Sequence, residues 1–116
     1  CFAADERCVQ AVSRVIQEHY RAWIGPIASG DCFVNTAQQV ARIKQEYPEA
    51  LCAEMEAASI AQVSAHYGVP FVVVRSLSDI TLKAGNAMTF EEYAQKASVR
   101  SAAWCEKVVV KLAECL

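Results

Sequence analysis

The chain has 116 residues, which is the length of one small domain and not of two. Hydrophobic residues make up 54% and charged residues 21%, which excludes a disordered protein. The net charge of −2 argues against nucleic acid or an anionic membrane as the main partner, because both require a basic face. No apolar run approaches the ~18–20 residues of a membrane-spanning helix.

The start of the chain carries no pattern of basic and then apolar residues, so it does not resemble a secretory signal. We expect a cytoplasmic protein, because its cysteines are used as free thiols rather than as a disulfide framework. The first residue is Cys1 and not methionine, which indicates a processed chain or a fragment.

The first half of the chain predicts two helices and a strand. Residues 5–23 are predicted to be helical because apolar side chains recur every three or four residues, at Val9, Val12, Ile16, Tyr20 and Trp23. Residues 24–29 form a strand candidate, although Pro26 cannot donate a hydrogen bond to a central ladder. A second helix is predicted over 36–47, capped by its threonine and stopped by the proline that follows.

The middle of the chain alternates strand and helix. Residues 50–53 are a short apolar stretch that predicts a buried strand, and a helix is predicted over 54–67, closed by Gly68. The run over 69–75 is almost continuously apolar and β-branched. That pattern is typical of a parallel strand covered on both faces.

The C-terminal part predicts a loop and one long helix. Residues 76–87 read as the loop, and Thr89 with Glu92 forms a capping box for a helix that runs to about Glu114. The buried stripe of this helix is predicted at Phe90, Ala94, Ala97, Trp104, Val108 and Leu112.

Alternation of helices and strands predicts an α/β fold with a mostly parallel sheet, in a single domain over 1–116. Three strands are few for such a sheet. We therefore expect part of the sheet to be supplied from elsewhere.

No two of the six cysteines are two or three residues apart, so the spacings typical of zinc ribbons and redox motifs are absent. The two histidines, His19 and His66, do not stand at ligand spacing to any cysteine. Several cysteines lie in apolar periodic stretches, where a free thiol behaves as a small hydrophobe. We expect reduced thiols, and no metal site.

Polar residues follow each predicted strand, where parallel α/β sheets bind ligands. They are Ser29, Gly30 and Asp31 with Phe33 after the first, Glu54, Met55 and Glu56 after the second, and Arg75, Ser78 and Asp79 after the third. Each has a simpler explanation. Acids are common in the first turn of a helix, aspartates are common in turns, and Met55 or Phe33 would ordinarily lie in a core.

Four segments in this order resemble one enzyme family. They are Ile27-Ala-Ser-Gly-Asp-Cys-Phe-Val34, Ala53-Glu-Met-Glu-Ala-Ala58, Val72-Val-Val-Arg-Ser-Leu-Ser-Asp79 and Thr89-Phe-Glu-Glu-Tyr93. Together they resemble the C-terminal half of a 5′-methylthioadenosine/S-adenosylhomocysteine nucleosidase, a member of the nucleoside phosphorylase superfamily. The resemblance implies a three-layer αβα fold, of which this chain is about half.

The resemblance also implies roles for site residues. Asp79 would be the general acid that protonates adenine N7, steadied by Ser78. Such an acid must hold its proton near neutral pH, and an apolar setting raises a carboxyl pKa. Glu56 would accept hydrogen bonds from the ribose hydroxyls, and Arg75 would lie near the nucleophilic water. The base and sugar would be lined by Phe33, Val34, Met55 and Phe90.

The family's chains are about twice this length. The glutamate that activates the water lies in their N-terminal half, and nothing in residues 1–22 matches that half. We therefore expect little or no hydrolysis by this chain alone. The resemblance implies no cofactor, a nucleoside substrate, and either a homodimer or association with a chain that supplies the other half. A phosphorylase, a futalosine-type hydrolase and a non-catalytic nucleoside-binding protein are the alternatives, and the Ser-Gly-Asp segment disfavours the second.

Overall fold

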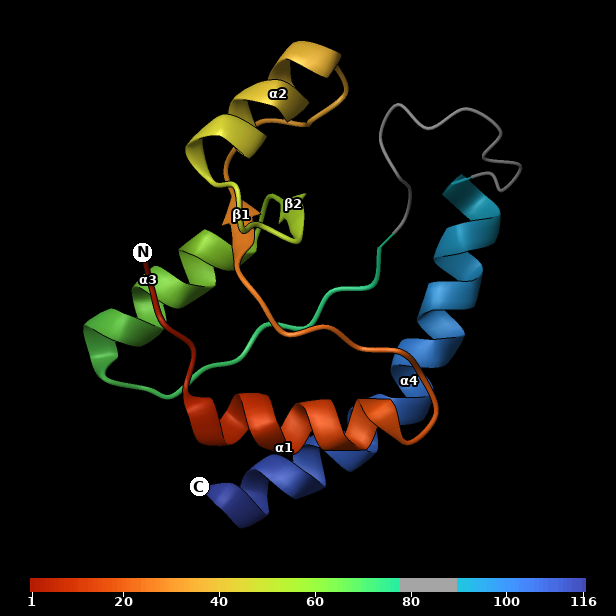
Figure 1. Cartoon of the computed structure of the whole chain (residues 1–116). Helices are drawn as coiled ribbons and strands as arrows, with labels where there is room; N and C mark the ends of the chain where they lie inside the picture. Colours follow the sequence, from red (N-terminus) through yellow and green to blue (C-terminus); the bar gives the residue numbers. More distant parts are fainter. Residues whose placement is uncertain (78–89) are drawn as a thin grey trace.

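The structure is a computed structural model that describes residues 1–77 and 90–116 (Figure 1). Its elements, in chain order, are α1 (Glu6–Gln17), β1 (Ile27–Ser29), α2 (Ala37–Glu46), β2 (Cys52–Glu54), α3 (Ala57–Tyr67) and α4 (Phe90–Cys115). Over the described residues, no helix is both long and apolar enough to cross a membrane. All six cysteines are free, as the sequence predicts.

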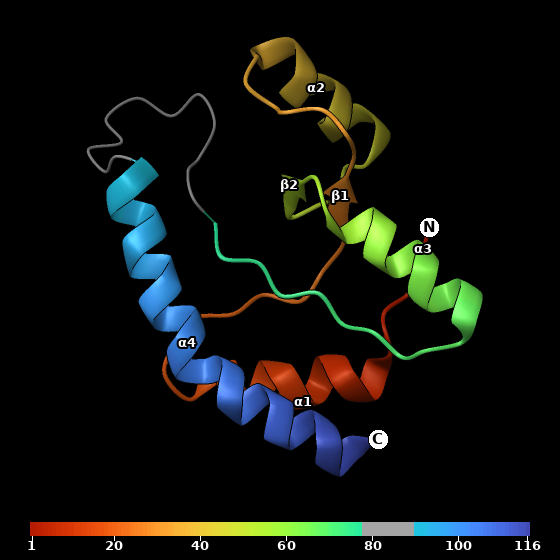
Figure 2. The same ribbon diagram turned by 180° about the vertical axis from the view of Figure 1, so that it is seen from behind.

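The hydrophobic core lies between α1 and the C-terminal half of α4, which lie side by side in both views (Figures 1 and 2). Val12 and Val15 of α1 and Val108 of α4 are buried there. The predicted stripe of the last helix is confirmed in its C-terminal half, because Trp104 and Leu112 pack against this cluster together with Ile16, Val72 and Val74.

The first helix is shorter than predicted. Asp5 caps it, accepting hydrogen bonds from the backbone N–H groups of Arg7 at 2.9 Å and Cys8 at 3.3 Å, and the helix ends at Gln17. Residues 18–23 continue the apolar spacing but not the helix, and the Trp23 side chain is 71% exposed.

The two strands are parallel, as predicted, with Ile27 opposite Cys52 and Ser29 opposite Glu54. Each is shorter or shifted relative to the prediction. Strand β1 begins only after Pro26, and β2 covers 52–54 and not 50–53. Beside them, a Cβ atom at Gly25 would lie 2.6 Å from the Leu51 Cδ1, so the half-exposed Leu51 side chain would have to move.

The prediction of a third strand over 69–75 is wrong for the described structure, in which these residues belong to no strand. A strand requires a neighbouring strand, and the sheet of the described residues contains β1 and β2 alone. The segment instead uses its apolar side chains, since Val72 and Val74 pack on the core between α1 and α4. The Phe71 carbonyl accepts a hydrogen bond from the Asp5 N–H at 2.9 Å.

The predicted boundaries of the other helices are largely confirmed. Thr36 caps α2 through a capping box with Gln39. Gly68 ends α3 in the left-handed conformation, with a φ of 65°, which glycine adopts without steric cost. Helix α3, however, begins at Ala57 rather than at residue 54, because Glu54 belongs to β2.

Candidate functional site

The candidate site lies where β1 and β2 end and α3 begins (Figure 1). Glu54, the last residue of β2, is buried, with 9% of its surface exposed. Its carboxylate accepts hydrogen bonds from the backbone N–H of Glu56 at 2.8 Å and of Ala57 at 2.9 and 3.0 Å. Ser29, opposite it in register, accepts one from the Ala58 N–H at 2.9 Å. The ends of both strands are thus tied to the first turn of α3.

Burial has the largest single effect on the pKa of the Glu54 carboxyl group, and it raises that pKa because it disfavours the ionised form. The hydrogen bonds from the Ser29 hydroxyl and from the N–H groups of Glu56 and Ala57, together with the charge of Arg75, outweigh it. The pKa of Glu54 therefore lies below its ordinary value, and the group is an anion at neutral pH. This role was missed at the sequence level, where the acid was placed in the first turn of the helix.

The structure brings Glu56 and Arg75, two of the predicted site residues, together. The Arg75 Nη1 lies 3.4 Å from the Glu56 Oε2, and the two side chains are 42% and 63% exposed. Glu56 is the N-cap residue of α3, but its side chain makes no capping hydrogen bond. Its Oε2 accepts a hydrogen bond from the Met55 N–H at 3.3 Å. An exposed carboxylate beside a guanidinium can therefore meet hydroxyl groups of a ligand.

The loop that follows β1 presents Phe33, whose side chain is 69% exposed, and the half-buried Val34. Gln39 holds this loop from α2. Its Oε1 accepts hydrogen bonds from the N–H of Asn35 at 2.9 Å and of Thr36 at 3.1 Å, and its Nε2 contacts the Cys32 Sγ at 3.2 Å. An exposed aromatic ring on a braced loop is suited to stacking on a flat base.

The remaining predicted residues are only partly visible. Ser78 and Asp79 lie outside the described residues, so the structure does not report on the predicted general acid. Phe90 is the first residue of α4, and its side chain also lies outside the description. Asp31, in the turn after β1, is exposed.

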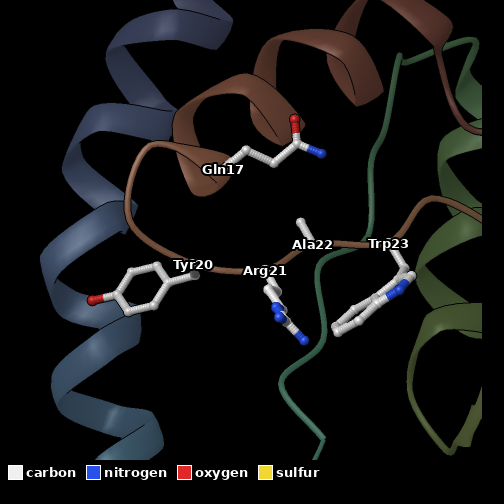
Figure 3. Close-up of a pocket in the computed structure, with 5 residues that line it drawn as sticks. All are labelled: Gln17, Tyr20, Arg21, Ala22 and Trp23. Carbon is white, nitrogen blue, oxygen red and sulfur yellow. The ribbon is translucent and has the colours of Figure 1, made fainter.

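A shallow hollow of about 380 Å³ lies elsewhere, along the turn that follows α1 (Figure 3). Its lining residues are Gln17, Tyr20, Arg21, Ala22 and Trp23. None of them belongs to the predicted site. Among the residues that the structure describes, no group of three or more His, Cys, Asp or Glu side chains could hold a metal ion.

Comparison with known proteins places the chain in a family. The sequence model described as "Phosphorylase superfamily" matches residues 1–110. A 5′-methylthioadenosine/S-adenosylhomocysteine nucleosidase of Staphylococcus aureus is 41% identical over 113 residues, which cover 96% of this chain and 49% of that protein. The chain belongs to the phosphorylase superfamily, and it spans about half the length of the curated relatives that it matches.

Solved structures agree with this assignment. A 5′-methylthioadenosine/S-adenosylhomocysteine nucleosidase from Colwellia psychrerythraea, solved in complex with adenine, superimposes with a TM-score of 0.81 and 35% identity over 96% of this chain and 47% of that one. The futalosine hydrolase of Helicobacter pylori superimposes with a TM-score of 0.80 and 31% identity over 95% and 45%. The fold is therefore nucleoside phosphorylase-like.

Proposed function

We propose that this chain forms the adenine- and ribose-binding side of a nucleosidase that hydrolyses 5′-methylthioadenosine or S-adenosylhomocysteine. The observation that carries the proposal is the exposed Glu56–Arg75 pair at the strand ends, 3.4 Å apart, in a chain 41% identical to such a nucleosidase. We also propose that its two-stranded sheet is part of a three-layer αβα domain.

Three side chains of this chain take part in the proposed reaction: Asp79, Glu56 and Arg75. Water attacks C1′ of the sugar and gives one proton to the water-activating glutamate of the other half, a C–O bond forms, and the bond from C1′ to the adenine nitrogen breaks. Asp79 gives its proton to adenine N7, so that adenine leaves neutral and a 5-thioribose remains. Glu56 accepts hydrogen bonds from the ribose hydroxyls, and its negative charge stabilises the developing sugar cation. Arg75 lies close to the attacking water.

Binding of the nucleoside uses the apolar residues around these groups. Phe33 stacks on the adenine, and the backbone of Val34 reads the edge of the base. Met55 covers the ribose face, Ser78 steadies Asp79, and Phe90 forms the wall near the 5′-thio group. The reaction uses small molecules, needs no metal or organic cofactor and is suited to a cytoplasmic enzyme.

Adenine release from methylthioadenosine by the complete protein, in phosphate-free buffer, tests the proposal. We expect Asp79→Asn to abolish release, because the leaving group then receives no proton. The control is Glu49→Gln, which changes an exposed acid in the turn before β2 and should keep full activity. Equal rates for Asp79→Asn and the unaltered protein would refute the role of Asp79.

The same assay separates the alternatives. A phosphorylase would need added phosphate and would form a sugar phosphate. A non-catalytic relative would bind the nucleoside without releasing adenine. The structural similarity to futalosine hydrolase favours one second candidate, so futalosine is assayed in parallel. Faster turnover of futalosine would move the assignment to that enzyme.

We propose that the protein acts as a homodimer or together with a chain that supplies the other half of the domain. Ile60, Val63 and Tyr67 of α3 are exposed at helical spacing, which supports such an association. Intact mass and sedimentation of the native protein test this directly.

A further inference from the structure

Two glutamates that are two residues apart have opposite environments. Glu54 is buried and its carboxylate is committed to backbone N–H groups, whereas Glu56 is exposed and makes no capping hydrogen bond. The capping work at the start of α3, usually done by the N-cap side chain itself, is thus performed by a residue of the preceding strand. This leaves the Glu56 carboxylate available to Arg75 and to a ligand.

The contacts of Glu54 fix the position of Glu56 directly. One carboxylate oxygen of Glu54 accepts the hydrogen bond from the Glu56 N–H itself, at 2.8 Å, and both oxygens accept one from the next residue, Ala57. The Ser29 hydroxyl braces the arrangement, because it accepts a hydrogen bond from the Ala58 N–H at 2.9 Å and helps to lower the pKa of Glu54. The backbone on both sides of the Glu56 Cα therefore has one defined position.

We propose that Glu54 is a positioning residue for ribose recognition: its buried carboxylate holds the backbone of Glu56 so that the Glu56 side chain stands beside Arg75. This inference rests on the proposed function, in which Glu56 binds the ribose hydroxyls. Misplacement of a binding group by about 1 Å can cost on the order of 100-fold in rate. Loss of the Glu54 carboxylate should therefore impair the binding of the sugar and spare the binding of the base.

The test compares a ligand with ribose and one without it, using the complete protein. In Glu54→Gln we expect the KM for methylthioadenosine to rise by about 10-fold or more, by the positioning argument. The inhibition constant of adenine, which has no ribose, should change by less than about 2-fold. A loss of stability alone would lower kcat through the active fraction and leave KM unchanged. An unchanged KM, or an equal rise in KM and in the adenine constant, would overturn the proposal.

Two further variants keep the test decisive. Ser29→Ala removes only the bracing hydroxyl, so it remains informative if Glu54→Gln does not fold, and it should raise KM in the same direction by a smaller factor. In a Glu56→Gln background, Glu54→Gln should add less than about 2-fold to KM, because the group that it positions is already lost. Full additivity of the two effects would contradict a shared role.

Failure of the proposed function is recognised separately. If the unaltered protein neither binds nor hydrolyses methylthioadenosine, hydrogen exchange still reports on the positioning. The amides of Glu56 and Ala57 should lose protection in Glu54→Gln and keep it in Glu49→Gln. Unchanged protection of these two amides in Glu54→Gln would overturn the positioning role.

Discussion

The helix pair of α1 and α4 and the region of β1, β2 and α3 are held together in different ways. In α1, five residues are buried, and Val12 and Val15 meet Val108 of α4 in an apolar cluster. In α3 only Ala57 and Ala61 are buried, and α2 has no buried residue. Capping and side-chain hydrogen bonds order this second region, while several of its larger apolar side chains, such as Ile60, Val63 and Tyr67, stay exposed. Packing thus holds the helix pair together, and the hydrogen-bonded region carries the surface that we propose for binding.

The largest expected effect comes from disrupting the packed region. Val12→Asp places a carboxylate in the apolar cluster, where it has no partner, and should lower the free energy of unfolding by about 3–5 kcal/mol. Urea unfolding followed by circular dichroism measures this loss. Val99→Asp, on the exposed side of α4, is the control and should cost no more than about 0.5 kcal/mol. Similar costs for the two variants would show that the core lies elsewhere.

The next effect tests the hydrogen bonds of the site region. Glu54→Gln exchanges a carboxylate for an amide at buried N–H groups and should cost about 1–3 kcal/mol at pH 7. Because folding lowers the pKa of Glu54, its stabilisation is present above the unfolded pKa and is lost as the pH falls through the folded pKa. The difference between the two proteins should therefore shrink below the ordinary value of 4.5. A difference that stays constant down to pH 3 would refute this linkage.

Gln39→Ala tests the loop that carries Phe33. It removes the side-chain half of the capping box and the bonds to Asn35 and Cys32, which should cost about 1 kcal/mol and weaken the binding of adenine several-fold. Gln38→Ala, at the neighbouring exposed position of the same helix, should change neither quantity. Thermal unfolding and adenine inhibition provide the two readouts. Identical adenine binding by both variants would mean that the hydrogen bonds of Gln39 do not contribute to adenine binding.

Glu56→Gln is expected to have the smallest effect on stability and a large effect on activity. The Glu56–Arg75 pair is mostly exposed, and such pairs contribute less than about 1 kcal/mol. Glu56→Gln should therefore change the free energy of unfolding by less than about 0.5 kcal/mol while it strongly reduces turnover of methylthioadenosine. A stability loss as large as that of Glu54→Gln would mean that Glu56 is structural. The two glutamates would then have no division of roles.

Local signals in the sequence predicted local features well. Thr36 as the cap of α2, Gly68 at the end of α3 and the spacing of Trp104, Val108 and Leu112 were all interpreted correctly. Each depends on residues within a turn or two of one another. The parallel relation of β1 and β2 also followed, because a helix connects them.

Features that depend on distant neighbours were not predictable in this way. The run over 69–75 has the composition of a buried strand, but a strand also needs a neighbour, and the described residues offer it none. Glu54 was assigned to the first turn of a helix rather than to the end of a strand, because three residues are too few to show either periodicity. Asp79, Ser78 and Phe90 acquired roles only through the family resemblance, and those roles stay predictions.

The most direct test of the account is adenine release from methylthioadenosine by the purified 116-residue chain alone, without phosphate. We propose that these residues form one side of the site and that the group that activates the water lies in the part of the relatives' length that they do not match. We therefore expect no release above background from the chain alone, and release from the complete native protein. Adenine release by the isolated chain at the rate of the complete protein would contradict it.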